Sequence, residues 1–175
     1  MSAGARRTPE VSAGGDPQRL AALINAYHDI VRTAPRRHPS WWGFIRYFLL
    51  DRHPVEGRAW SLYRLEAEIR GSGDPRIHFA LNCGAVSCPP IREYEAEHLD
   101  AQLAIATRSY LADPAGCRFD AETRTLHLSR LFRWYRRDFG DVLTFVRHHL
   151  EPEQAEALEG PGLRIRYLDW DWTPT

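Results

Sequence analysis

The sequence predicts a single α+β domain, residues 17–175, in which a small, mostly antiparallel sheet is surrounded by helices. Three observations support this prediction. Apolar residues recur at helical spacing through most of the chain, whereas strand-like alternation is confined to short segments. Helices and strands do not follow the regular βαβ order of a doubly wound fold. No repeat, linker or change of composition divides the 175 residues, and this length suits one domain with a sizeable core.

The composition excludes several classes of protein. The 23 basic and 23 acidic residues cancel, so no net charge favours nucleic acid or an anionic membrane as a partner. All the basic residues are arginine, which excludes Schiff-base chemistry on a lysine. No apolar run reaches the length of about 20 residues that spans a bilayer. Residues 1–16 are expected to be flexible, and they lack the apolar core of a secretory signal.

These properties predict a cytoplasmic protein whose partner is a small molecule. They leave the oligomeric state open. An odd number of cysteines, three in all, does not favour a disulfide scaffold.

Helices are predicted ahead of the centre of the chain. Asp16-Pro17 is a typical helix start, and the first helix should end near Pro35. A second helix over residues 40–50 is apolar nearly all round, which is typical of a buried helix or of a pocket wall. Residues 51–57 are expected to form a loop, and residues 61–70 a short amphipathic helix.

The residues with the most chemistry gather in the segment 76–90, RIHFALNCGAVSCPP. Its apolar run Ile77–Leu81 is expected to form a buried strand that carries His78. The strand should lead into a loop that holds Cys83 and Cys88. In a straight strand His78 and Cys83 would face opposite sides, so the turn after residue 81 would have to bring them together.

The second half of the chain mixes helices with a hairpin. The expected elements are a helix over 93–112, a hairpin of 117–120 with 125–128, helices over 129–139 and 141–150, a turn or helix over 152–158, and a closing strand over 163–172. Cys117 then lies in a strand and is not expected to pair with the loop cysteines.

A thiol nucleophile is the leading interpretation of the central segment. Cysteine reacts as the thiolate, whose formation at neutral pH requires lowering an ordinary pKa of about 8.5. We expect Cys83 to be the nucleophile and His78 or His28 to be its base, with His127 a weaker third candidate. Asn25 or Asn82 would orient an imidazole or donate to an oxyanion, and Asp138 would orient a histidine.

Other uses of the two cysteines remain open. Cys83 and Cys88 are separated by four residues, a spacing that permits a disulfide only if the turn brings their α-carbons within about 7 Å. It differs from the Cys-x-x-Cys of thioredoxin-like proteins. Zinc held by both cysteines and a histidine is a further possibility. Because no second ligand pair accompanies them, we predict no metal and no cofactor.

Several motifs together resemble the family known as domain of unknown function 547. The resemblance extends over roughly residues 18–172 and rests on Ile24-Asn25-Ala26-Tyr27, Ser61-Leu62 with Glu66 and Arg70, the run Asp74 to Gly84, Ser87-Cys88-Pro89-Pro90, Phe132-Arg133-Trp134-Tyr135 with Asp138-Phe139, and Asp169-Trp170-Asp171-Trp172.

The resemblance implies a shared fold and site, but no particular reaction. Many of the family's members look secreted or multidomain, whereas this chain begins without a signal. Relatives usually carry an asparagine at the position of His28, and bulkier aromatic residues at Ala21-Ala22-Leu23. These departures lie on the first helix and imply a more open pocket with an added base.

We therefore expect a thiol-dependent enzyme that performs acyl transfer, hydrolysis or cyclisation on a small molecule, in a specialised biosynthetic pathway. Its mixed build is loosely like that of papain- and transglutaminase-related enzymes. The residues expected to bind substrate are Tyr27, Trp41, Trp42, Glu66, Cys88, Trp134, Tyr135 and Asp138. Three alternatives remain: a redox or sulfur-handling protein that uses Cys83 and Cys88, an acid–base enzyme that uses His28 or Asp138 without a covalent step, and a non-catalytic binding module.

Overall fold

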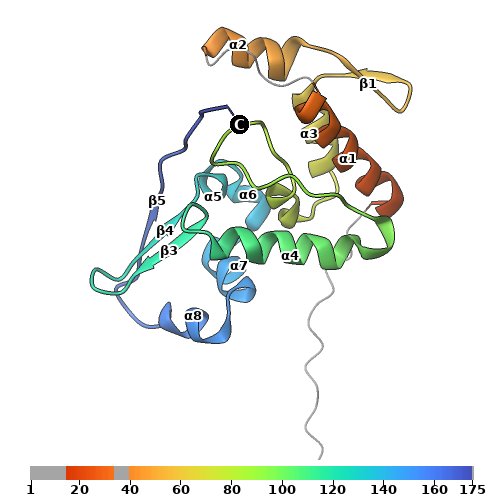
Figure 1. Ribbon diagram of the computed structural model, residues 1–175. Helices are drawn as coiled ribbons and strands as arrows, with labels where there is room; N and C mark the ends of the chain where they lie inside the picture. The colour runs from red at the N-terminus through yellow and green to blue at the C-terminus, as the bar shows by residue number, and fades with distance from the viewer. Residues whose placement is uncertain (1–14, 34–39, 175) are drawn as a thin grey trace, which may run out of the picture.

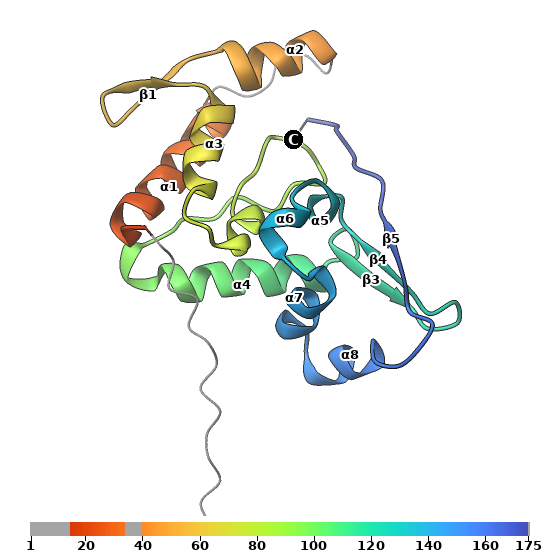
Figure 2. The same cartoon turned by 180° about the vertical axis from the view of Figure 1, so that it is seen from behind.

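The computed structural model describes residues 15–33 and 40–174. Residues 1–14, which we predicted to be flexible, lie outside the described residues, and so does the predicted end of the first helix near Pro35. In Figures 1 and 2 one group of elements is formed by the first helices and a small hairpin, and a second group by a sheet with the later helices. Helix α4 (Leu99–Ala112) runs from the first group to the second.

The first group contains α1 (Pro17–Thr33), α2 (Trp41–Ile45), the π-helical turn η1 (Arg46–Leu50), β1 (His53–Val55), β2 (Arg58–Trp60) and α3 (Leu62–Arg70). The 3-10 helices η2 (Pro75–Phe79) and η3 (Ala96–His98) follow before α4. The second group contains β3 (Cys117–Asp120), β4 (Thr125–Leu128), α5 (Leu131–Trp134), α6 (Arg136–Phe139), α7 (Val142–His149), α8 (Pro152–Ala157) and β5 (Arg164–Tyr167).

The predicted α+β class is confirmed. Strands β3 and β4 form the predicted hairpin, with Cys117 opposite Leu128, and β5 adds to β4 in parallel. The structure corrects the prediction of a loop at 51–57, because β1 pairs antiparallel with β2 and forms a second, two-stranded sheet. The sequence signal was weak because each of these strands is only three residues long.

The central segment also differs from its prediction, because Ile77–Leu81 is not a strand. Residues Pro75–Phe79 form the 3-10 helix η2, which begins with proline in the first turn. The Asp74 side chain caps it by accepting a hydrogen bond from the Arg76 backbone N–H at 2.9 Å. The Arg76 guanidinium returns to the same carboxylate at 2.7 Å. These local interactions outweigh the strand preference of the short apolar run.

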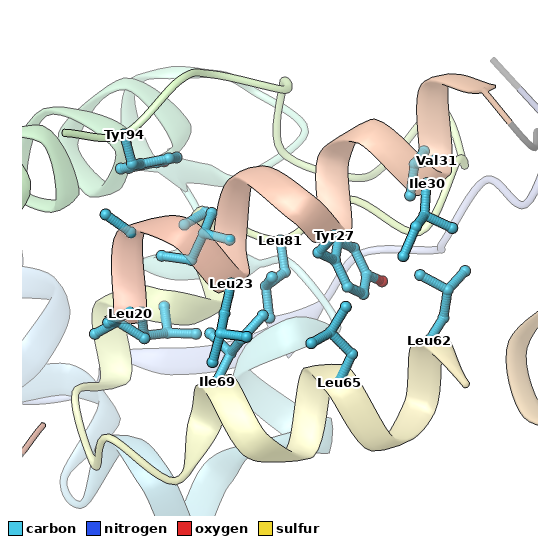
Figure 3. Packing of buried hydrophobic residues seen from close by; sticks show 14 of the residues in the cluster. Leu20, Leu23, Tyr27, Ile30, Val31, Leu62, Leu65, Ile69, Leu81 and Tyr94 are labelled. Atoms are coloured by element: carbon cyan, nitrogen blue, oxygen red, sulfur yellow. The ribbon is translucent and has the colours of Figure 1, made fainter. Parts of the chain in front are cut away.

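Helix η2 lies where two hydrophobic clusters meet. Ile77 belongs to the cluster formed mainly by α1 and α3, whose interlocking side chains are shown in Figure 3. Phe79, two residues later, belongs to the other cluster, where its ring contacts Phe132 and Phe139. Both side chains are fully buried, so η2 is held from two sides.

Side chains of helix α1 contact the backbone at both ends of residues 80–94, the segment that follows η2. His28 is buried, and its ring nitrogens lie 2.7 Å from the Ala80 carbonyl oxygen and 2.9 Å from that of Arg92. Burial lowers the pKa of His28, while the two carbonyl contacts act in the opposite direction. One turn earlier, Asn25 donates to the Tyr94 carbonyl at 2.8 Å and accepts from its N–H at 3.0 Å.

This arrangement predicts that His28→Ala destabilises the fold by about 2 to 3 kcal/mol, because the variant loses the buried ring and the hydrogen bond that its N–H donates to one of the two carbonyl groups. Urea unfolding should show the lower free energy of unfolding. Amide hydrogen exchange should accelerate most in residues 80–92. Asp29→Ala is the matched control, since Asp29 is exposed on the same helix. Equal stability of the two variants would contradict the role of His28 in holding the two ends of the segment 80–92.

Candidate functional site

One cavity of about 380 Å³ collects most of the predicted site residues. Elements that are far apart in the sequence form its wall: α1, α2 with η1, α3, η2, the cysteine loop, α5 and the C-terminal segment. The lining residues are Tyr27, Phe44, Phe48, Glu66, His78, Leu81, Cys83, Cys88, Pro89, Leu131, Trp134, Tyr135, Trp170 and Trp172. A volume of this size is typical of a small-molecule site.

The loop after η2 folds back on itself around Asn82. Its side-chain amide donates to the Pro89 carbonyl at 2.7 Å, and its oxygen accepts the Gly84 N–H at 2.6 Å. Gly84 has a φ of +78°, a conformation that residues with a Cβ rarely adopt. The loop thereby brings Cys83 and Cys88 together, with 2.8 Å between their sulfur atoms.

The surroundings of this pair favour negative charge on Cys88. Its pKa is lowered, first by the hydrogen bond from the Cys83 thiol, against the opposing effect of burial. Backbone N–H groups of Cys83 and Ala85 lower it further, and the Cys83 nitrogen lies 3.2 Å from the Cys88 sulfur. Two backbone dipoles and a thiol therefore stabilise a thiolate at this position.

His78 enters the same cavity from η2 and is held by residues of α6 and its neighbours. Its Nε2 lies 2.9 Å from Asp138 Oδ2, and its ring stacks on that of Tyr135 at a centroid distance of 4.0 Å. Burial lowers the pKa of His78 to about 4, although the Asp138 carboxylate raises it. The ring is therefore neutral at pH 7, and Nε2–H donating to Asp138 leaves Nδ1 as the basic nitrogen.

A second carboxylate lies behind Tyr135. The Tyr135 hydroxyl donates to Glu66 at 2.8 Å, and the Arg70 guanidinium lies 3.5 Å from the same oxygen. Burial raises the pKa of Glu66, while Tyr135 and Arg70 act in the opposite direction. Arg70 also lies 3.7 Å from Asp138 and 4.9 Å from the centre of the Tyr135 ring. The positive charge of Arg70 thus lies close to the carboxylates of both Glu66 and Asp138.

Aromatic rings close the remaining side. Trp134 contacts Trp170 at a centroid distance of 5.0 Å and Trp172 at 5.7 Å. Trp172 in turn meets the edge of Phe44, which comes from α2. These contacts join α2, α5 and the C-terminal segment, which are separated by more than thirty residues in the sequence.

The C-terminal tryptophans reach the cavity because the end of the chain pairs with the cysteine loop. The Val86 N–H donates to the Thr173 carbonyl at 2.9 Å, and Ser87 Oγ accepts the Asp171 N–H at 2.8 Å. Figure 1 shows the end of the chain beside this loop. The prediction missed Trp170, Trp172, Phe44, Phe48 and Arg70 as parts of the site. The repeated Asp-Trp at 169–172 was the signal that pointed to two of them.

Several predicted site residues lie elsewhere. Both polar groups of Asn25 are bonded to the backbone of Tyr94, and both ring nitrogens of His28 face carbonyl oxygens. Neither residue lines the cavity, so the structure gives no support to their predicted catalytic roles. The amide of Asn82 is likewise occupied within its own loop.

The predicted tryptophan wall of the second helix is also corrected. Trp42 is 76% exposed and does not line the cavity, because the opposite side of α2 faces inward with Phe44. The side chain of Trp41 lies outside the described part of the structure. His127 lies on β4 and Cys117 on β3, away from the cavity.

The described residues show no metal cluster. Within residues 15–33 and 40–174, no three His, Cys, Asp or Glu side chains are placed to hold a metal ion. Over the same residues, the helices are too short or too polar to cross a bilayer.

Comparison with known proteins agrees with the sequence motifs. The chain matches none of the curated proteins and none of the solved structures with which it was compared. The sequence profile described as "Protein of unknown function, DUF547" matches residues 12–111. This range includes Glu66, His78 and both loop cysteines, and it ends before Tyr135 and Asp138. It covers more than half of the chain, which therefore belongs to the DUF547 family.

Proposed function

We propose that this protein is a thiol-dependent enzyme that transfers or hydrolyses the acyl group of a small molecule. The observation that carries the proposal is that two cysteines and His78, a histidine held by Asp138, line one cavity. Covalent acyl transfer requires a thiolate and an oriented neutral imidazole that can reach the same substrate.

The hydrogen bonds around Cys88 support its role as the nucleophile, in place of Cys83. Its thiolate would attack the carbonyl carbon, form a carbon–sulfur bond and move an electron pair onto the carbonyl oxygen. Collapse of that intermediate would expel the leaving group with its bonding electrons and leave a thioester. Cys83 would act as the thiol that stabilises the thiolate before attack.

His78 would serve in the second half of the reaction. Its Nδ1 would take a proton from the attacking water or acceptor alcohol, and Asp138 would stabilise the imidazolium that forms. Release of the acyl group would then return the thiolate to Cys88. Arg70 and Glu66 would hold Asp138 and Tyr135 in position around the ring.

A dithiol–disulfide protein is the second candidate, favoured by the distance of 2.8 Å between the two sulfur atoms. Oxidation to a disulfide of about 2.05 Å would need only a small rotation of the side chains. The two thiols would lose two protons and two electrons to a partner disulfide, which would become a dithiol.

The acyl-transfer proposal predicts a burst of nitrophenol when the enzyme meets 4-nitrophenyl acetate. Cys88→Ser should reduce the burst by about 100-fold or more. Cys83→Ala should keep a burst but shift its pH dependence upward, because the thiolate at Cys88 loses the hydrogen bond from the Cys83 side chain. Cys117→Ser is the control, since Cys117 lies on β3 and should leave the burst unchanged. A full burst in Cys88→Ser would contradict the assignment.

The buried neutral His78 predicts a specific dependence of stability on pH. Its folded-state pKa of about 4 lies below the ordinary value of 6.5, so the unfolded chain binds more protons between these values. The free energy of unfolding should therefore fall as the pH is lowered from about 6.5 to about 4, by about 3 kcal/mol for this residue. Urea titrations of wild type and His78→Gln should show a shallower decline in the variant. Parallel curves would show that His78 titrates normally.

The redox candidate predicts a crosslink under mild oxidation. Glutathione disulfide should remove two hydrogens from the tryptic peptide of residues 77–92, which contains both Cys83 and Cys88, and mass spectrometry should detect this loss of mass. Cys117 should remain available to alkylation after unfolding. If Cys83 and Cys88 both stay alkylatable after oxidation, the redox candidate is excluded.

A further inference from the structure

Two buried hydrogen-bond donors in the wall of the cavity have no partner in the described part of the chain. Tyr27 is completely buried, and its hydroxyl makes no hydrogen bond with any described residue. The indole Nε1 of Trp170 is in the same situation. Both residues line the cavity that holds the cysteines. Because an unsatisfied buried donor is costly, these two groups indicate a ligand that brings acceptor oxygens to them.

Tyr27 lies in the electrostatic neighbourhood of the reacting groups. Burial raises its pKa well above the ordinary value, and negative charge on Glu66, Cys83 and Cys88 raises it further. The hydroxyl therefore stays protonated at neutral pH and remains a donor. A donor near the sulfur atoms is suited to the oxygen of a carbonyl group under attack.

The charges around the cavity select an uncharged ligand. Glu66 is the carboxylate among the described lining residues, and Tyr135 and Arg70 already satisfy it. No arginine occurs among those lining residues, the chain has no lysine, and His78 is neutral at pH 7. A free carboxylate would therefore be buried without a counter-ion, and Glu66, which a cation could otherwise approach, is already paired. The remaining negative group, a thiolate at Cys88, is used up when it attacks the ligand.

The shape of the wall selects a flat, apolar group. Trp134, Trp170, Trp172 and Phe44 surround one side of a volume of about 380 Å³. Aromatic rings at these separations pack favourably against another ring at an offset or edge-on angle. The space suits one ring with a short carbonyl substituent.

We propose that the substrate is an uncharged ester or thioester of an aromatic carboxylic acid, bound with its ring among the tryptophans and its carbonyl oxygen on the Tyr27 hydroxyl. This substrate class rests on the proposed acyl-transfer function, which supplies the carbonyl group to be attacked. Tyr27 would donate to that oxygen in the bound ester and to the oxyanion formed when the thiolate adds. The Trp170 indole would donate to the second oxygen of an ester, or to the same carbonyl oxygen of a thioester.

Binding can be measured apart from chemistry in the double variant Cys83→Ser/Cys88→Ser. Three probes share one ring and differ in charge: methyl benzoate, benzoate and benzyltrimethylammonium. Calorimetry and quenching of tryptophan fluorescence at pH 7.5 should show methyl benzoate binding at least about tenfold more tightly than either ion. Equal or tighter binding of benzoate or of the ammonium probe would overturn the proposal, and so would the absence of methyl benzoate binding up to its solubility.

The role of Tyr27 is tested by adding Tyr27→Phe to the double variant. Methyl benzoate should bind about five- to tenfold more weakly, while the melting temperature stays equal or rises because an unsatisfied buried hydroxyl has been removed. Tyr63→Phe is the matched control, since Tyr63 is half exposed and lies outside the cavity wall. Unchanged affinity in Tyr27→Phe would refute the contact.

The two proposals fail separately in these experiments. If methyl benzoate binds as expected but the wild type forms no acyl-enzyme with the phenyl ester of benzoic acid, the acyl-transfer function is wrong and the ligand class stands. If the wild type is acylated by 4-nitrophenyl acetate but methyl benzoate does not bind, the substrate class is wrong and the function stands.

Discussion

The site depends on burying a polar segment between two hydrophobic clusters. Residues 74–90 carry a carboxylate, a histidine, an amide and two thiols into the centre of the molecule, where each polar group needs a partner. Asp74 satisfies the start of η2, His28 faces the carbonyl groups of Ala80 and Arg92, and Asn82 fastens the loop to itself. The two sulfur atoms are brought together as a consequence of meeting these requirements.

Charge balance around the cavity follows from the same burial. A single arginine, Arg70, reaches Glu66 and Asp138 and covers the face of the Tyr135 ring. The same ring stacks on His78, which burial keeps neutral. In this cavity, hydrogen bonds from Cys83 lower the pKa of Cys88, and none of the described lining residues is an arginine. This distinguishes it from thiol sites in which a charged histidine stabilises the sulfur.

The wall of the cavity comes from both halves of the chain. The family match at residues 12–111 contains the cysteine loop, η2 and α3, which hold Cys83, Cys88, His78 and Glu66. Trp134, Tyr135 and the C-terminal tryptophans lie beyond the matched residues and supply most of the aromatic surface. The thiol and imidazole groups of the cavity and most of its aromatic surface therefore come from different parts of the sequence, and the hydrogen bond between Val86 and Thr173 joins these parts.

The sequence by itself determined the α+β class, the hairpin of β3 and β4 and most helices, because periodicity and capping residues act over a few neighbours. It also placed His78, Cys83 and Cys88 in one short segment, which stays the predicted centre of the site. It misassigned Ile77–Leu81, where the Asp74 cap and Pro75 outweighed a short apolar run. Only the tertiary structure decided that His28 bonds to backbone while His78 enters the cavity, and that Trp170 and Trp172 line it while Trp42 is exposed. These outcomes depend on contacts between residues dozens of positions apart, such as His28 with Ala80 and Ser87 with Asp171, which local spacing does not encode.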